Sequence, residues 1–319
     1  MKDTNQKTFD VAVVGEVNAD LIIKGNVVPV FGQVEQIVDI AYLVMGSSAV
    51  IFACGCAQLG LRTKFVGKVG DDLFGRFMID SMQDRGVDTS GTVIDAEIGT
   101  GLSVILASGG DRAILTYPGC IPELSFEDID FSIIRKCRHL HLSSYFLLDK
   151  LRPNISKLFE KAKGLGLSVS LDTNYDPAEK WDNSVNKALR FVDVFLPNET
   201  EAKAIAGEDN IHKAINSLSQ KVDTVAVKLG AQGAAGKAGN QPEFFQNTAV
   251  VQVEDTVGAG DSFDAGFVYG YLHEWPLVQT LKFAVACGSI STLKPGGTAG
   301  QATAEEAQKF IEKHLTERN

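Results

Sequence analysis

The strongest chemical signal in this sequence is a short run rich in small residues. Residues 254–266 read EDTVGAGDSFDAG, and they follow an apolar run at 250–253 that we expect to be a strand. Phe263, Phe267 and Tyr271 then recur at intervals of four, which is the spacing of an apolar helical face. The run therefore stands where a strand leads into a long helix.

Gly258, Ala259 and Gly260 fall in the first turn of that helix or just before it. Small residues there let a ligand approach the backbone closely. The first N–H groups of a helix have no partner inside it and lie at the positive end of its dipole, so the turn predicts an anion-binding site. Asp261 would stand beside the anion, where a carboxylate can take a proton from an attacking hydroxyl.

Asp261 has two interpretations. The plainer one is a helix-capping acid in a glycine turn. The other is phosphoryl transfer, in which the protein mainly positions the reactants and stabilises charge, so that an anion hole and one base suffice. The complete DTVGAGD run at residues 255–261, at a strand–helix junction, favours the second interpretation.

The elements that would position this run alternate between strands and helices. Candidate strands lie at 11–15, 63–69, 139–142, 168–172, 192–196 and 224–228, and candidate helices at 47–59, 72–84, 150–165, 182–190 and 198–218. This alternation predicts βαβ units, and hence an α/β fold with a mostly parallel sheet covered on both faces. Two β-rich insertions, at about 21–44 and 97–117, do not fit that sheet and could pair with each other as a small lid. We expect a single domain over residues 1–319.

Composition argues against several classes of protein. The net charge of −10 without a basic stripe makes nucleic acid or a membrane surface a poor partner. The apolar runs are too short to span a bilayer, and the polar residues 1–10 do not resemble a secretory signal, so we expect a cytoplasmic protein. Five cysteines without a CxxC pair disfavour disulfides and zinc. His139 and His141 could share a strand face, which we interpret as a polar face because no further metal ligand lies nearby in sequence.

The run DTVGAGDSFDAG resembles the C-terminal signature of the ribokinase-like, or PfkB, carbohydrate kinases. The resemblance covers about residues 11–300, and its C-terminal motif is highly specific. Other segments agree in order and spacing, namely GEVNAD at 15–20, the glycine-bounded stretch 46–60, VGKVGDDLFG at 66–75, PNETEA at 197–202 and VKLGAQG at 227–233. The resemblance implies a ribokinase-like three-layer α/β/α fold with a β-lid, and transfer of the γ-phosphoryl group of ATP to a hydroxyl group.

The resemblance also implies roles for single residues on the acceptor side. Asp20 would accept hydrogen bonds from two sugar hydroxyls, assisted by Asn18 and by Gly46 of the N-terminal signature. The alternative for Asp20 is an exposed turn residue that follows a strand. The N–H groups at 258–260 would contact the transferred phosphate, and Asp261 would be the general base.

On the nucleotide side, Lys228, Gly230 and Gly233 would flank ATP, although Lys228 could equally be a solvated strand end. Asn198 and Glu201 would act through Mg²⁺ and water; they could also form a helix N-cap with a capping-box acid, and both roles can hold together. Asp255, with the backbone at 294–298, would bind a monovalent cation such as K⁺, or cap its own turn.

Two positions depart from the family pattern. The usual Gly-Gly pair is Gly46-Ser47, and Ile51 stands where a sugar-binding Asn is usual, so one hydrogen bond to the acceptor is lost or replaced and substrate choice should change. Residues 172–177, DTNYDP, resemble a DxNxRP segment with Asp176 in place of Arg, which argues against a sugar acid. We therefore expect a ribose-like or other neutral sugar.

Three alternatives compete with this interpretation. A nucleoside kinase of the same family shares the phosphoryl-transfer residues. A catalytically silent sugar sensor is disfavoured because Asp261 and the glycine turn are intact. An NAD-dependent oxidoreductase is weaker still, since residues 15–18 do not continue as GxGxxG. Exposed lid edges would favour pairing of two copies as a homodimer.

Overall fold

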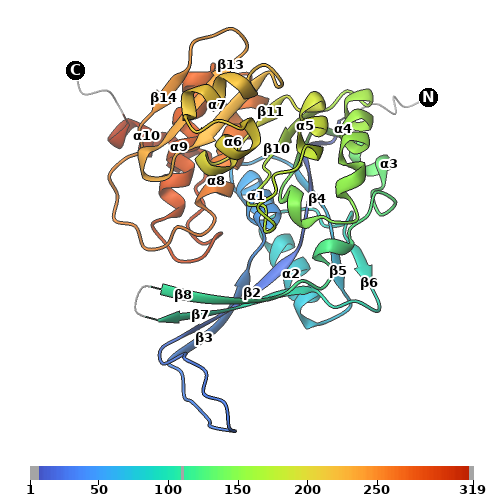
Figure 1. Ribbon diagram of the computed structural model, residues 1–319, viewed down its shortest axis with the longest axis vertical. Helices are drawn as coiled ribbons and strands as arrows, with labels where there is room; N and C mark the ends of the chain where they lie inside the picture. Colours follow the sequence, from blue (N-terminus) through green and yellow to red (C-terminus); the bar gives the residue numbers. More distant parts are fainter. Residues whose placement is uncertain (1–6, 109–110, 316–319) are drawn as a thin grey trace.

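The computed structural model describes residues 7–108 and 111–315, which are arranged as a helix-covered sheet with a smaller sheet projecting from it (Figure 1). The main sheet has the strand order β14-β13-β12-β11-β10-β9-β1-β4. Its neighbours from β4 to β12 pair in parallel, while β13 and β14 pair antiparallel. The strands are β1 (Phe9–Val14), β4 (Thr63–Val66), β9 (Cys137–Leu142), β10 (Ser168–Leu171), β11 (Val194–Phe195), β12 (Thr224–Lys228), β13 (Ala234–Ala238) and β14 (Phe244–Gln246).

Helices cover both faces of this sheet, because its central strands are buried on both sides. Along β1, Val11 and Val13 face one hydrophobic core, and Ala12 and Val14 face the other, as the two-residue period of a strand requires. One core includes residues of α1 (Ser48–Gln58), α2 (Leu73–Asp84), α8 (Ala259–Leu272), α9 (Leu277–Ser291) and α10 (Ala304–His314). The other includes residues of α3 (Phe131–Ile134), α4 (Ile155–Gly164), α5 (Ser184–Ala188), α6 (Glu199–Ala206) and α7 (Ile211–Leu218). The predicted three-layer α/β/α arrangement is confirmed.

The two β-rich insertions pair with each other in a four-stranded sheet of order β3-β2-β7-β8. Its strands are β2 (Asn18–Lys24), β3 (Ile40–Met45), β7 (Gly101–Ser108) and β8 (Asp111–Tyr117). β2 runs parallel to β7, and its other neighbour, β3, is antiparallel. This projecting sheet extends from the body below α1 in Figure 1. A further short pair consists of β5 (Lys68–Gly70) and β6 (Val93–Asp95).

Several element boundaries differ from the sequence-based expectation, three of them in ways that affect the site or the connections around it. The expected strand at 250–253 is irregular, and Val250 is fully exposed with no neighbouring strand to pair with it. The expected helix at 198–218 is two helices, because Gly207 adopts a left-handed conformation that ends α6. The expected strand at 63–69 is divided at Gly67 into β4 and β5.

Short connections complete the described chain. Turns of 3₁₀ helix lie at Ile121–Glu123, Tyr145–Leu147, Arg152–Asn154, Leu189–Phe191 and Gly230–Gln232. All five cysteines are free and buried. Among residues 7–108 and 111–315, no helix has the length and hydrophobicity needed to cross a bilayer.

Candidate active site

The glycine turn before α8 is held by its contacts with two other segments. Gly258 is the N-cap of α8 and has a φ of 72°, a conformation that suits glycine. A Cβ on Gly258 would lie 2.6 Å from the Cα of Gly297 and 3.0 Å from the Ile51 side chain. Ile51 is 3% exposed, and its side chain packs against this turn. The sequence led us to expect that Ile51, in place of the usual Asn, costs one hydrogen bond to the sugar. Its packing against the turn explains why a branched apolar residue stands there.

The first turn of α8 offers backbone donors. Ala259, Gly260 and Asp261 occupy its first three positions, where helical geometry gives N–H groups no internal partner. The N–H of Ala259 already donates to the carbonyl of Thr256 at 3.3 Å, so Ala259 is a poorer phosphate donor than the sequence suggested. A Cβ on Gly260 would meet its nearest neighbour, Lys228, at 3.5 Å, which leaves this part of the turn open to a ligand.

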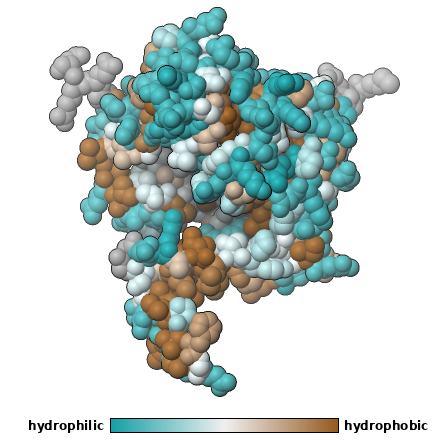
Figure 2. Space-filling view, viewed as in Figure 1, coloured by the Kyte–Doolittle hydropathy of each residue, from teal (hydrophilic) through white to brown (hydrophobic). Residues whose placement is uncertain are grey.

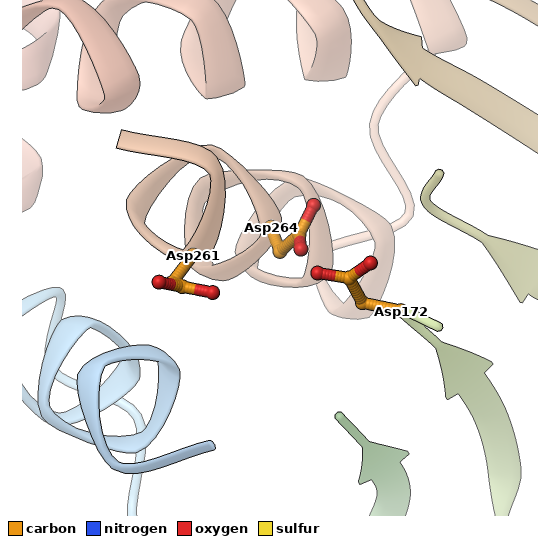
Figure 3. Close-up of side chains that lie close together, drawn as sticks. All are labelled: Asp172, Asp261 and Asp264. Carbon is orange, nitrogen blue, oxygen red and sulfur yellow. The ribbon is translucent and has the colours of Figure 1, made fainter. Parts of the chain in front are cut away.

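Asp261 is nearly buried, at 9% exposure, and its carboxylate points toward α1 (Figure 3). Burial, followed by repulsion from the nearby carboxylate of Asp172, raises the pKa of Asp261 to about 7. Lys228 and the hydroxyl of Ser48 act in the opposite direction. A carboxyl group with this pKa can both accept and release a proton near neutral pH, which suits a general base.

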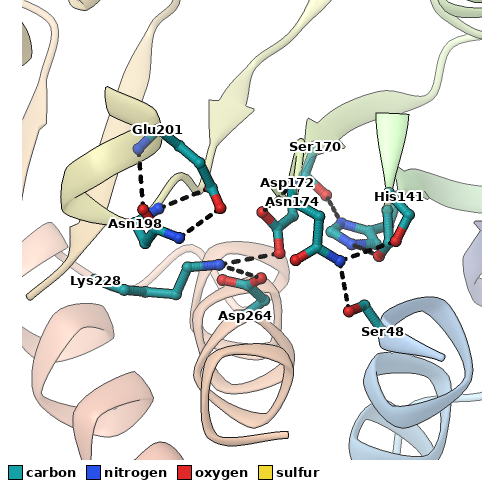
Figure 4. A network of polar contacts seen from close by, with 11 residues as sticks. Ser48, His141, Ser170, Asp172, Asn174, Asn198, Glu201, Lys228 and Asp264 are labelled. Carbon is teal, nitrogen blue, oxygen red and sulfur yellow. Dashed lines mark hydrogen bonds and ion pairs between the residues drawn. The ribbon is translucent and has the colours of Figure 1, made fainter. Parts of the chain in front are cut away.

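A largely buried lysine, Lys228, joins two carboxylates near Asp261 (Figure 4). Lys228 Nζ lies 3.0 Å from Asp172 and 2.9 Å from Asp264, and the side chains of both acids are almost completely buried. Asp172, Asp261 and Asp264 each place a carboxylate oxygen within 4.8 Å of the other two. Lys228, whose side chain is 13% exposed, is therefore the counter-ion of an acidic cluster, and the interpretation of it as a solvated strand end is wrong.

Asn198 and Glu201 form the capping box of α6. The Asn198 side chain accepts from the N–H of Glu201 at 3.0 Å, and Glu201 accepts from the N–H of Asn198 at the same distance. Burial, followed by repulsion from Asp172, raises the pKa of Glu201 to about 7. Four carboxylates, including Glu201, thus surround one ammonium group. Carboxylate oxygens with uncompensated negative charge fit a Mg²⁺ ion, which prefers oxygen ligands.

Two cavities lie on either side of the turn at 256–260. One has a volume of about 530 Å³ and is lined by Lys228, Gly230, Gly233 and Gly260, together with apolar residues of the 248–253 segment and of α9. Gly233 has a φ of 97°, and a Cβ there would lie 2.0 Å from the carbonyl oxygen of Gln246. The three residues expected at the nucleotide therefore line one cavity, which we call the α9-side cavity.

The second cavity has a volume of about 770 Å³ and lies against the projecting sheet; we call it the sheet-side cavity. Asp20 lines it, and Asn18 Nδ2 donates to Asp20 at 2.7 Å. Gly46 has no room for a side chain, since a Cβ would lie 2.5 Å from an Asp20 oxygen. Burial raises the pKa of Asp20 to about 6. The structure thus brings together the three residues expected at the acceptor, although Asp261 is not among the residues that line either cavity.

Asp255 and Asp176 both bind backbone N–H groups. Asp255 accepts from Val257 and Gly296, each at 3.0 Å, and so ties the glycine turn to the 294–298 segment. Asp176 is 3% exposed and accepts from three N–H groups of its own loop, at 178, 180 and 181. The charge of Asp176 is used locally, so it gives no basis for excluding a sugar acid.

His139 and His141 are both buried, on strand β9. His139 contacts Ser168 and Ser170, and His141 contacts Ser170 and Ser143, each at 2.7–2.8 Å. The expected polar face is thus an internal ladder of hydrogen bonds with both imidazoles on one side of β9 and β10. Sequence alternation identified the shared face but not its burial.

Comparison with known proteins assigns the chain to a family. The pfkB family carbohydrate kinase description matches residues 8–304. The chain belongs to the pfkB carbohydrate kinase family. This pfkB kinase is 36% identical to an uncharacterised sugar kinase of Archaeoglobus fulgidus over 68% of its length and 86% of the relative. It is 28% identical to the 5-dehydro-2-deoxygluconokinase of Geobacillus kaustophilus over 97% of its length and 95% of the relative.

The fold comparison agrees with the family. The Escherichia coli protein called ribokinase II, solved in complex with ATP and Mg²⁺, superposes with a TM-score of 0.85 at 23% identity, covering 96% of this chain and 100% of that one. The family match makes the protein an ATP-dependent carbohydrate kinase. Sequence reasoning missed the roles of Asp172 and Ser48, because neither could be placed beside Asp261 without knowing how β10, α1 and α8 meet. It also missed Asp264, although this residue stands three positions after Asp261 on the predicted helix, and that spacing could have identified it.

Proposed function

We propose that this pfkB kinase transfers the γ-phosphoryl group of ATP to a hydroxyl of a neutral, ribose-like sugar, with Asp261 as general base. The observation that carries the proposal is the position of the turn at 256–260 between two cavities of suitable size. ATP would occupy the α9-side cavity, and the sugar would occupy the sheet-side cavity. The phosphoryl group would then cross the positive end of α8, where charge can be stabilised.

The residues divide into four roles in this proposal. Asp20 and Asn18 bind sugar hydroxyls, and the free N–H groups at Gly258 and Gly260 bind the phosphoryl group as an anion hole. Asp261 takes the proton of the attacking hydroxyl. Mg²⁺ would neutralise phosphate charge near Asn198 and Glu201, acting through water. Because Asp261 lines neither cavity, we propose that the projecting sheet acts as a lid that brings the sugar toward it.

The charge of the sheet-side cavity supports a neutral acceptor. It is lined by four carboxylates, those of Asp20, Asp111, Glu254 and Asp255, and by two cations, Lys24 and Arg112. Its formal charge of 2 − 4 = −2 disfavours a carboxylate ligand. A sugar acid is the second candidate, because the Geobacillus relative acts on one by name and Lys24 and Arg112 could pair with it. We also propose that K⁺ binds near Asp255, with the backbone of the 294–298 segment.

Initial rates of ATP consumption across ribose, fructose, nucleosides and a sugar acid, with and without K⁺, test the acceptor. We expect ribose-like sugars to be phosphorylated best. Asp261→Asn should lower kcat by roughly 10²–10⁴ while leaving KM for ATP unchanged. Asp80→Asn, on an exposed part of α2, is the matched control. Near-normal turnover in Asp261→Asn would remove this residue from the base role, and a chain that binds sugars but consumes no ATP would be a silent member.

We further propose that two copies pair through the projecting sheet. Hydrophobic side chains gather along the projecting sheet and its β2–β3 connection (Figure 2). The exposed ones include Val28, Phe31, Ile37, Ile114 and Leu115. An apolar patch of this kind on a soluble domain usually contacts a partner. Light scattering over a hundredfold range of concentration should give twice the chain mass of 34.3 kDa, and Phe31→Ser should shift the protein to the monomer. A constant mass of one chain would reject the dimer.

A further inference from the structure

The run VGKVGDDLFG at residues 66–75 has no part in the roles proposed above, yet three of its residues surround one threonine. Thr100 directly precedes β7, the strand of the projecting sheet that pairs with β2. Thr100 is 1% exposed, and it contacts Asp72 and lies against Gly70 and Gly75. The run therefore encloses the point at which β7 begins.

Asp72 holds Thr100 by two hydrogen bonds and also caps a helix. Its Oδ2 accepts from the N–H of Thr100 at 2.7 Å, and its Oδ1 accepts from the Thr100 hydroxyl at 2.9 Å. The same Oδ1 accepts from the N–H of Gly75 at 2.7 Å, which makes Asp72 the N-cap of α2. Hydrogen bonds to an ionised carboxylate are stronger than those between neutral groups. One carboxylate therefore joins the start of α2 to the start of β7.

The two glycines of this run make the close approach to Thr100 possible. The N–H of Gly70 donates to Thr100 Oγ1 at 2.9 Å. A Cβ on Gly70 would lie 2.7 Å from the Thr100 nitrogen, and a Cβ on Gly75 would lie 2.8 Å from the Thr100 hydroxyl oxygen. Real Cβ atoms do not come this close to other atoms, so the approach requires glycine at both positions. The spacing Gly-x-Asp-x-x-Gly at residues 70–75 is thus explained by packing around one residue.

The pairing of β7 with β2 connects this contact to the residues proposed to bind the sugar. Gly101, the first residue of β7, pairs with Asn18. Two residues further along, Ser103 pairs with Asp20. The amide Nδ2 of Asn18 donates to Ser103 Oγ at 3.1 Å and to Asp20 at 2.7 Å. A change in the position of β7 would therefore move both proposed sugar ligands.

On the other side of the contact, α2 is attached to the body of the protein. Its side chains Met78 and Met82 are completely buried in the hydrophobic core that also includes residues of α1 and α8. The helix that Asp72 caps thus shares a core with the helix that carries the glycine turn and Asp261. Asp72 therefore joins the phosphoryl-transfer side of the molecule to the sugar side.

We propose that Asp72 is a positioning residue for the sugar site: by holding Thr100 it fixes where β7 begins, and so sets the two sugar ligands on β2 relative to the glycine turn. Asp72 lines neither cavity, so it touches neither reactant and acts through the projecting sheet. This inference rests on the proposed binding of the sugar by Asp20 in the sheet-side cavity.

The test separates this role from helix capping. Serine and asparagine cap helices about as well as aspartate, so Asp72→Ser and Asp72→Asn keep the cap of α2. Serine offers one oxygen in place of two, and asparagine turns an NH₂ group toward the N–H of Thr100, so each variant weakens the contact with β7. For the sugar that is phosphorylated fastest in the panel above, we expect KM to rise about tenfold in both variants, with KM for ATP unchanged. Asn210→Ser, at the exposed N-cap of α7, is the matched control and should change neither KM.

Substitutions of the partner residue should give a matching result. Thr100→Val removes the hydroxyl and should raise KM for the sugar, whereas Thr100→Ser keeps the hydroxyl and should stay close to the parent value. Thr100→Val should add little to the effect of Asp72→Ser, because both substitutions weaken the same contact. If one of these variants does not fold, the others apply the same test.

Amide hydrogen exchange gives a second readout that needs no sugar. In Asp72→Ser, residues 18–24 and 101–106 should exchange faster than in the parent protein, because the projecting sheet loses its attachment to α2. Exchange in β9 should be unchanged, and Asn210→Ser should alter neither region.

The outcomes distinguish this inference from the proposed function. If Asp20→Ala raises KM for the sugar and the Asp72 variants do not, the positioning role is wrong and the proposed sugar site stands. If Asp20→Ala leaves that KM unchanged, the sugar site fails and the positioning role fails with it. Unchanged exchange in β2 and β7 of Asp72→Ser rejects the positioning role even where no sugar is phosphorylated. Faster exchange there, together with a rise in KM for the sugar alone, supports it.

Discussion

Two buried polar regions lie on the same sheet and differ in how completely their groups are paired. In the histidine–serine ladder, both ring nitrogens of His139 and of His141 contact a serine hydroxyl. In the acidic cluster around Lys228, two carboxylates share one ammonium group, and Asp264 Oδ1 has no hydrogen-bond partner among the described residues. Complete pairing is what a structural core needs, whereas unpaired buried charge is costly and is retained where a ligand completes it.

The titration of the two regions differs in the same way. Burial lowers the pKa of His139 to about 3 and that of His141 well below its usual value, so both imidazoles stay neutral in the folded protein. Burial raises the pKa of Asp261 and of Glu201 to about 7. One region therefore avoids charge altogether, and the other holds carboxyl groups that change protonation near physiological pH. Such groups are suited to proton transfer and to binding a cation.

The largest effect should follow from removing the cation of the acidic cluster. Lys228→Met leaves Asp172 and Asp264 buried without a counter-ion, and breaking a buried ion pair in this way costs about 3–5 kcal/mol of unfolding free energy. Urea denaturation measures the loss. Lys203→Met, which removes a partly exposed pair with Glu199, is the control and should cost less than about 1 kcal/mol.

A second substitution shows whether charge is the cause. Adding Asp264→Asn to Lys228→Met should restore part of the lost stability, because one uncompensated carboxylate is removed. Two results would contradict the view that Lys228 holds the cluster together. One is a double variant whose loss of unfolding free energy is the sum of the two single losses. The other is a Lys228→Met protein that is as stable as the Lys203→Met control.

The contrast between the two regions also explains what could be predicted from the sequence. The strand–helix alternation predicted the three layers, and the glycine run predicted that Asp261 lies in the first turn of a helix. Both predictions depend on residues that are close together in the chain. Lys228 pairs with residues 56 and 36 positions away, and local sequence cannot show such contacts. The misplaced strand at 250–253 shows the converse: an apolar run without a neighbouring strand stays irregular.

The two regions should respond to acid in opposite directions. Unfolded histidines titrate near pH 6.5 but stay neutral when folded, so below that pH the unfolded chain binds more protons and the ladder loses stability by about 2.7 kcal/mol per pH unit for two residues. Asp261 and Glu201 behave oppositely, because the folded protein holds protons between about pH 7 and 4.5 that the unfolded chain releases. Their contribution therefore grows as the pH falls through this window.

Free energies of unfolding between pH 4.5 and 6 separate the two contributions, which oppose each other in the parent protein. In a His139→Leu/His141→Leu variant, stability should rise as the pH falls, whatever its absolute value, because only the carboxyl contribution remains. In Asp261→Asn/Glu201→Gln, stability should fall more steeply with acid than in the parent. His212→Leu, whose side chain is 58% exposed, is the control. Equal slopes in all four proteins would mean that burial does not set the charge of either region, and the distinction between a neutral ladder and a titrating cluster would be lost.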